Sequence, residues 1–306
     1  ALILVPLTAL LIWHDTIVWT EMQAGGWLVD RLGLRGAGVA LTGAEIAGAA
    51  ALFLLLPALM RRVWETVPLG PGKLRDDLLD MCARNRVRIR EILVWRTDGM
   101  MANAAVMGLA RPLRYILITD GLLERLPREQ VDAVMAHEIA HIRRCHLPWL
   151  AVAVIGALLA IALALRPLDP ALARLGGAGE AIEGALLLLG AGLVFGLVSR
   201  RFEWQADAFA AADRSIAETA PDGPATVTPA AVHAMSGALL AVAVLNHVAP
   251  ARFSFRHGSI RSRRRRLGRL VGRRVDRLGI DRQVRIIKML SMLGLAIAVA
   301  GWILVS

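Results

Sequence analysis

Hydrophobic residues in this chain are gathered in long uncharged runs rather than in short alternating patterns. The clearest run covers residues 147–165 without a single charge, which is long enough to cross a bilayer as a helix. Similar runs cover about 37–60, broken only by Glu45, and about 181–198 and 289–305. The first thirteen residues are also apolar, and we expect them to be the end of a further span. The pattern predicts a mainly α-helical membrane protein.

Arginine pairs mark the ends of these runs that face two polar segments, 61–146 and 199–285. Basic residues are enriched on the cytoplasmic side of membrane spans, so both polar segments are predicted to lie in the cytoplasm. The predicted organisation is two N-terminal spans in 1–60, a cytoplasmic segment 61–146, a membrane hairpin 147–198, a cytoplasmic segment 199–285 and a C-terminal span 286–306.

The polar segments predict a small α+β domain. Alternation and turn residues favour strands over 89–95, 101–107 and 115–119, and helical periodicity favours helices over 74–84, 122–126 and 128–146. The apolar stretch 229–249 opens with Thr228-Pro229, a favourable helix start. We expect it to pack on the cytoplasmic domain rather than to cross the membrane.

Composition supports membrane insertion and limits the partners. The chain has 306 residues, 56% of them hydrophobic, with a formal net charge of +11, which is too apolar for an ordinary soluble domain. Nine arginines lie between Arg261 and Arg277. Beside a span they fit membrane topology and anionic lipid, and no aromatic residues interleave with them, so nucleic acid is not an expected partner. Cys82 and Cys145 are expected to be free thiols in a reducing compartment.

The candidate chemistry lies in the helix predicted over 128–146, which contains His137-Glu138-Ile139-Ala140-His141. Two histidines four residues apart share one helix face and can bind one zinc ion, and Glu138 can take a proton from a water that the ion activates. Such a motif also arises by chance, and it supplies only two ligands. Because catalytic zinc normally has three protein ligands, the sequence demands a third one elsewhere.

Two carboxylates supply a candidate third ligand. Glu203 and Asp207 lie one turn apart on a helix predicted directly after the run 181–198. Glu203 can complete a His₂Glu zinc site, and Asp207 can accept the free ring N–H of a ligand histidine. The alternative is a solvated acidic pair beside arginines.

These motifs together resemble the integral-membrane zinc metallopeptidases of the HtpX and CAAX prenyl protease type. The resemblance lies in HExxH just before an apolar run, Glu-x-x-Ala-Asp just after one, and the run Ile118-Thr119-Asp120-Gly121-Leu122-Leu123. His257-Gly258-Ser259, followed by Arg263, is similar to a family element in which proline usually follows the histidine. The resemblance covers about 70–270.

The resemblance implies a zincin-like catalytic domain with one zinc ion per chain, held by His137, His141 and Glu203, and with Glu138 as the general base. It makes His257 and Arg263 candidates for stabilising an oxyanion; the alternative for His257 is a surface histidine. Asn103, Ala104 and Ala105 resemble a substrate-binding edge strand, which holds an extended peptide by β-augmentation. The alternative is an ordinary hairpin strand.

The sequence therefore predicts a zinc endopeptidase in a bacterial cytoplasmic membrane, with its active site on the cytoplasmic side. Its partners would be the lipid bilayer and peptide or membrane-protein substrates, in quality control or processing. One alternative is a non-catalytic zinc-binding scaffold or sensor. Another is an intramembrane-cleaving protease, which the charges flanking the HExxH motif disfavour. A basic lipid- or nucleic-acid-binding module is the third.

Overall fold

The computed structural model describes residues 4–108, 111–219 and 225–305. They divide into two compact units, which we describe separately. Unit 1 comprises Ala1–Pro71, Arg88–Thr97 and Ala105–Ile118, and unit 2 comprises Gly72–Val87, Asp98–Ala104 and Thr119–Ser306. The division differs from the expected ranges, because the strands group mainly with the N-terminal helix and the HExxH helix groups with the later helices.

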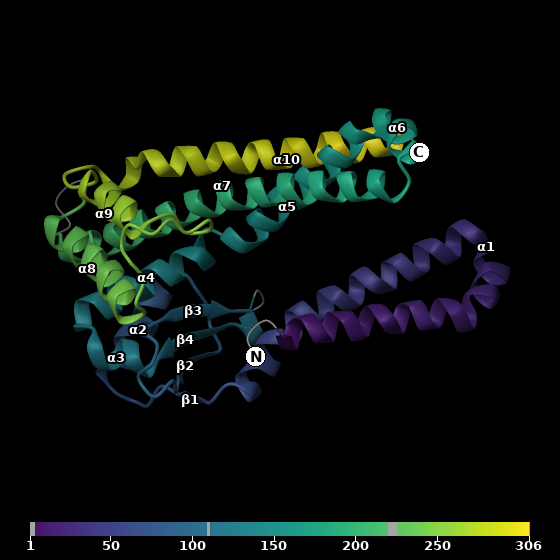
Figure 1. The fold of residues 1–306 in the computed structure, drawn as a ribbon. Coiled ribbons are helices and arrows are strands. Elements are labelled where there is room, and N and C mark those ends of the chain that lie inside the picture. Colours follow the sequence, from purple (N-terminus) through teal and green to yellow (C-terminus); the bar gives the residue numbers. More distant parts are fainter. Residues whose placement is uncertain (1–3, 109–110, 220–224, 306) are drawn as a thin grey trace. The chain divides into compact units, whose positions relative to one another are not determined.

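The N-terminal helix α1 (Leu4–Val63) turns back on itself, so that its two halves lie side by side (Figure 1). The turn is at Gly33, whose φ of 70° suits a residue without a Cβ. Trp13 Nε1 donates to the carbonyl of Glu45 at 3.2 Å, and His14 Nδ1 lies 2.8 Å from Glu45 Oε1. Glu45 thus joins the two halves. The first apolar run ends at residue 13, but the helix continues to the glycine.

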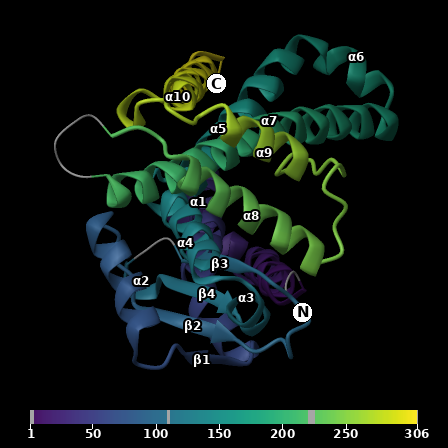
Figure 2. The same ribbon diagram turned by 90° about the vertical axis from the view of Figure 1, so that its left-hand side faces the viewer.

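A four-stranded sheet follows α1 in unit 1, with its strands in the order β1-β2-β4-β3 (Figure 2). The strands are β1 (Thr66–Pro68), β2 (Glu91–Trp95), β3 (Ala104–Met107) and β4 (Tyr115–Thr119), and a short 3₁₀ turn, η1 (Arg111–Leu113), precedes β4. The prediction for 115–119 is confirmed, whereas β2 and β3 begin later than expected. The sequence reasoning missed β1, whose three residues are too few to show a period.

Unit 2 begins with the helices that precede the membrane-type helices. They are α2 (Lys73–Arg84), α3 (Asp120–Arg125) and α4 (Arg128–Arg143). α2 buries Leu78, Met81 and Cys82 on one face, as its periodicity predicts. Burial raises the pKa of the Cys82 thiol to about 11, despite the nearby charge of Arg84. Cys82 is therefore an unreactive core thiol.

Three long helices lie side by side in unit 2: α5 (His146–Leu165), α7 (Gly177–Glu218) and α10 (Gly279–Val305) (Figure 1). A core of Ala153, Val198, Phe202 and Val284 joins them. Two short pieces, η2 (Arg166–Leu168) and α6 (Asp169–Arg174), connect α5 to α7. Among the described residues, these three helices and α1 are long and apolar enough to cross a membrane. The protein is a multi-pass integral membrane protein.

The HExxH helix does not run on into the next span, which corrects the helix expected over 128–146. α4 ends at Arg143, and Cys145 adopts a left-handed conformation (φ 54°) before α5 begins at His146. α7, in contrast, continues without a break from its apolar part into the helix that carries Glu203 and Asp207.

The remaining helices cover α4 and α7. Helix α8 (Pro229–Leu245) is capped by the Thr228 side chain, which accepts a hydrogen bond from the Ala231 backbone N–H. It packs against α4 and α7, which confirms that this stretch is a helix packed on the domain. Helix α9 (Ile260–Gly268) and the 3₁₀ turn η3 (Val275–Arg277) complete the unit.

Candidate active site

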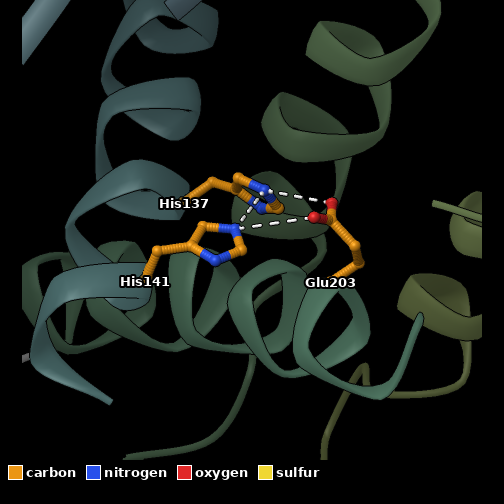
Figure 3. A group of neighbouring side chains, drawn as sticks. All are labelled: His137, His141 and Glu203. Carbon is orange, nitrogen blue, oxygen red and sulfur yellow. Dashed lines mark hydrogen bonds and ion pairs between the residues drawn. The ribbon is translucent and has the colours of Figure 1, made fainter. Parts of the chain in front are cut away.

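Two histidines of α4 and a glutamate of α7 point toward one another (Figure 3). His137 Nε2 lies 3.2 Å from His141 Nε2. The Glu203 carboxylate lies 3.6 Å from His137 Nε2 and 3.8 Å from His141 Nε2. The three residues predicted to bind a metal are thus brought together, although Glu203 lies 62 positions after His141 in the sequence.

This donor set fits a zinc ion. The three ligand atoms all lie within 4.8 Å of one another. For bonds of about 2.0–2.1 Å, the edge of a tetrahedron around zinc is about 3.3–3.4 Å. The separations of 3.2, 3.6 and 3.8 Å are close to that edge. Two imidazoles and a carboxylate are also a ligand set that catalytic zinc uses.

The charges around the two histidines favour a cation between them. Burial lowers the pKa of His137, but Asp207 and Glu203 outweigh it and raise that pKa to about 10. Burial and the positive charge of His137 instead lower the pKa of His141 well below its usual range. A cation between the rings is thus stabilised by both carboxylates, and a metal ion can take the place of the proton on His137.

Asp207 and Arg263 support His137. Asp207 Oδ1 lies 3.0 Å from His137 Nδ1, and because the ring is not aligned for a hydrogen bond, the contact is electrostatic. Arg263 donates from Nε to Asp207 Oδ2 at 2.8 Å and from Nη2 to Asp207 Oδ1 at 2.6 Å. Its Nη1 lies 3.3 Å from Glu203. This arginine holds both carboxylates, a role that the sequence reasoning did not assign to it.

A second set of side chains supports His141, and the sequence reasoning missed it. His146 Nδ1 lies 3.0 Å from His141 Nδ1, and His146 Nε2 lies 2.9 Å from Gln205 Oε1. The His146 ring is stacked on Phe202, with ring centroids 4.5 Å apart. In a continuous helix, His146 would point about 140° away from His141. The break at Cys145 lets it turn back, so spacing alone could not find it.

A cavity of about 500 Å³ opens beside these candidate ligands. His137 and Glu203 border it, as does Glu138, which is half-buried. His257 lines it too, with Nδ1 3.1 Å from Glu203 Oε1 and a side chain that is 43% exposed. Asn103 and Ala104 line the same cavity, whereas Ala105 is not among its lining residues. Most of the remaining wall is apolar and comes from α8 and the segment after it: Met235, Ala238, Leu239, Val242, Ala243, Val248 and Phe253.

Glycine at position 258, where the resembled family element usually has proline, has a local cause. Gly258 has φ 74° and pairs with Ser254 across a tight turn. Proline fixes φ near −65° and cannot adopt this conformation. The next residue, Ser259, caps α9 by accepting from the Ser262 backbone N–H. His257 still reaches the cavity, because the turn presents it there.

Comparison with known proteins agrees with this geometry. A family model described as Peptidase family M48 matches residues 74–262, a range that includes every metal-ligand candidate. The chain belongs to peptidase family M48. A relative, the protease HtpX homolog of Aeropyrum pernix, is 32% identical over 210 residues, which cover 62% of this chain. Those residues span 64% of the relative's own length. The resemblance inferred from the motifs is confirmed.

The M48 chain also resembles a solved structure. The crystal structure of S. mikatae Ste24p matches with a TM-score of 0.56 over 84% of this chain and 66% of that chain. Sequence identity is 17%, so the likeness concerns the fold. It confirms the predicted fold class, transmembrane helices joined to an α+β domain with a small sheet.

Proposed function

We propose that this protein is a zinc-dependent endopeptidase that cleaves peptide bonds at the cytoplasmic face of the membrane. The observation that carries the proposal is the His137, His141 and Glu203 group beside a cavity that Glu138 also lines. The family supports it, because M48 is a peptidase family. When bound, the ion would lower the pKa of a water molecule and polarise the scissile carbonyl.

Different residues would bind the ion, orient its ligands and transfer the proton. His137, His141 and Glu203 would hold it, and Asp207 would orient His137. Glu138 follows His137 directly in α4 and borders the cavity. It would accept the proton of the attacking water and deliver it to the leaving amine.

His257 is the better candidate for stabilising the oxyanion. Its side chain is partly exposed to the cavity and can donate a hydrogen bond where negative charge develops. Arg263 borders the same cavity, but it is 6% exposed and its donors meet Asp207 and Glu203. We therefore assign Arg263 to holding the carboxylates in place, which revises the role expected from the sequence.

The cavity wall suits an extended peptide with apolar side chains. Ala104 opens β3, which lies at the edge of the sheet, and Asn103 precedes it. The extended backbone at Asn103 and Ala104 would hold a peptide backbone by β-augmentation, and the apolar wall from α8 would take a side chain. Membrane proteins expose such segments when they are damaged, so we propose quality control or processing as the role, in a bacterial cytoplasmic membrane as predicted from the sequence.

The decisive experiment is Glu138→Gln, which keeps the size of the side chain and removes the base. We expect peptide-bond hydrolysis to fall about 10²–10⁴-fold, while the purified chain keeps one equivalent of zinc by elemental analysis. Full activity in this variant would overturn the assignment of Glu138. Glu203→Ala is expected to lose the zinc.

The same pair of variants separates the proposal from a zinc-binding scaffold or sensor. A scaffold would show no hydrolysis in the parent chain, and Glu138→Gln would leave its metal content and its behaviour unchanged. Glu138 favours the enzyme, because a purely structural zinc site has no use for a base beside the ion.

A further inference from the structure

A line of hydrogen-bonding groups runs from the ligand His141 to the C-terminal helix. His141 Nδ1 lies 3.0 Å from His146 Nδ1, and His146 Nε2 lies 2.9 Å from Gln205 Oε1. Gln205 Nε2 donates to Asp281 Oδ1 at 2.5 Å, in the first turn of α10. His146 and Gln205 are both buried. Four helices, α4, α5, α7 and α10, each contribute one residue to this line.

The proposed zinc site fixes which atoms of this line donate and which accept, starting at His141. His141 Nε2 faces His137 and Glu203, so it is the ligand atom. A neutral imidazole that binds a metal through Nε2 carries its proton on Nδ1. His141 Nδ1 is therefore a donor. Because it faces His146 Nδ1, that atom must be an acceptor, and His146 must carry its own proton on Nε2.

Asp281, at the other end of the line, requires the same order of donors and acceptors. An ionised aspartate only accepts hydrogen bonds, so Asp281 turns the Gln205 amide to present its NH₂ group to the carboxylate. The amide oxygen of Gln205 then faces His146 Nε2, which must donate. Both ends select one tautomer of His146, and neither end conflicts with the other.

We propose that His146 is a positioning residue, which with Gln205 and Asp281 fixes the tautomer and the ring orientation of the metal ligand His141. The inference rests on the proposed metal site. It also gives α10 a role that its apolar character does not show, because the first turn of α10 supplies the carboxylate that sets the direction of the line. A change at Asp281 should thus reach the metal through three hydrogen bonds.

The first experiment compares His146→Asn with His146→Leu in the full chain in detergent. The two side chains have nearly the same shape, but only asparagine can accept from His141 Nδ1. We expect the leucine variant to weaken zinc binding about 10–100-fold, measured by competition with a fluorescent zinc chelator. The asparagine variant should recover most of that loss. In the cobalt-substituted chain, the leucine variant should shift the visible absorption bands and the asparagine variant should not.

The second experiment changes the far end of the line. Asp281→Asn keeps an acceptor oxygen for Gln205, whereas Asp281→Leu removes it and frees the amide to turn over. A reversed amide would place a donor against His146 Nε2 and so favour the wrong tautomer. We expect weaker zinc binding in the leucine variant than in the asparagine variant. Asp276→Leu is the control, because Asp276 is an exposed carboxylate that accepts from Arg274 and not from Gln205, and its loss should leave zinc affinity unchanged.

The outcomes separate this inference from the proposed function. Equal zinc affinity and equal cobalt spectra in the parent chain and in all His146 and Asp281 variants would overturn the positioning role and leave the metal site standing. Failure of the parent chain to bind zinc, or unchanged binding in His137→Ala, would overturn both. If His146→Leu lowers the thermal stability of the metal-free chain, its zinc affinity no longer tests the positioning role. The Asp281 variants then decide: Asp281→Leu must bind zinc more weakly than Asp281→Asn, and equal affinities would overturn the inference.

Discussion

The two histidines of the proposed metal site, His137 and His141 of α4, lie in surroundings of opposite character. Around His137 lies a buried cluster of charges, in which Arg263 bridges Asp207 and Glu203. Around His141 lies a line of neutral groups, His146 and Gln205, that reaches a carboxylate only at Asp281. The charges around His137 favour a cation between the two histidines. The neutral groups around His141 fix its ring proton on Nδ1. The difference teaches that two histidines of one proposed metal site can be held by different interactions, one by buried ion pairs and the other by neutral hydrogen bonds.

This contrast predicts that substitutions around His137 and around His141 will impair different properties of the protein. Removing one member of a buried ion pair leaves a charge without a partner, which is expensive for the fold itself. Removing a neutral group such as His146 or Gln205 costs hydrogen bonds, each worth about 0.5–1.5 kcal/mol. Damage near His137 should therefore lower stability, and damage near His141 should appear mainly in metal binding.

Arg263→Met tests the charged side and should have the largest effect. It removes the arginine that holds two buried carboxylates and leaves protonated His137 to balance both, so we expect the free energy of unfolding of the metal-free chain to fall by about 3–5 kcal/mol. The measurement is thermal or denaturant unfolding in detergent after treatment with a chelator. Arg265→Met, an exposed position on the same helix, is the matched control and should change little.

Adding Asp207→Asn to Arg263→Met sharpens this result. The second substitution removes one of the two stranded carboxylates, so the double variant should be more stable than Arg263→Met alone. A double variant that is less stable than either single variant would show that the pair acts through packing rather than through charge.

The pH dependence of metal binding tests the difference between the two rings. Metal must displace the proton from His137, whose pKa is raised to about 10, while His141 is already neutral at pH 7 because its pKa is lowered. Zinc affinity should therefore rise with pH, about tenfold per pH unit between pH 7 and 9, and level off near pH 10. Calorimetry in buffers of different ionisation enthalpy should count one proton released. Two protons, or none, would contradict the contrast.

Phe202→Leu tests the neutral side more gently. The Phe202 ring is stacked on His146, and such ring pairs contribute about 0.5–1.5 kcal/mol. We expect a loss of zinc affinity smaller than that of His146→Leu. Val198→Ala, in the same core cluster, should lower stability without changing zinc affinity. Equal effects of the two variants on affinity would mean that the stack does not orient His146.

Much of the site could be predicted because its parts are local. The i, i+4 spacing places His137 and His141 on one face of any helix, and the same spacing pairs Glu203 with Asp207. Long uncharged runs predict spans whatever the fold. Strand β4 follows from five consecutive β-forming residues, while β1 is too short to leave a pattern. The helix over 229–245 follows from its Thr-Pro start and apolar composition.

The sequence by itself determined the candidate ligand set and the membrane character of this protein. Only the tertiary structure decided how the ligands are held. The left-handed turn at Cys145 directs His146 back to His141, and the packing of α7 against α5 and α10 brings Gln205 to both His146 and Asp281. Arg263 meets Asp207 across 56 residues for the same reason. Periodicity fixes which residues share a face, whereas contacts between distant helices depend on where each helix ends and what it packs against.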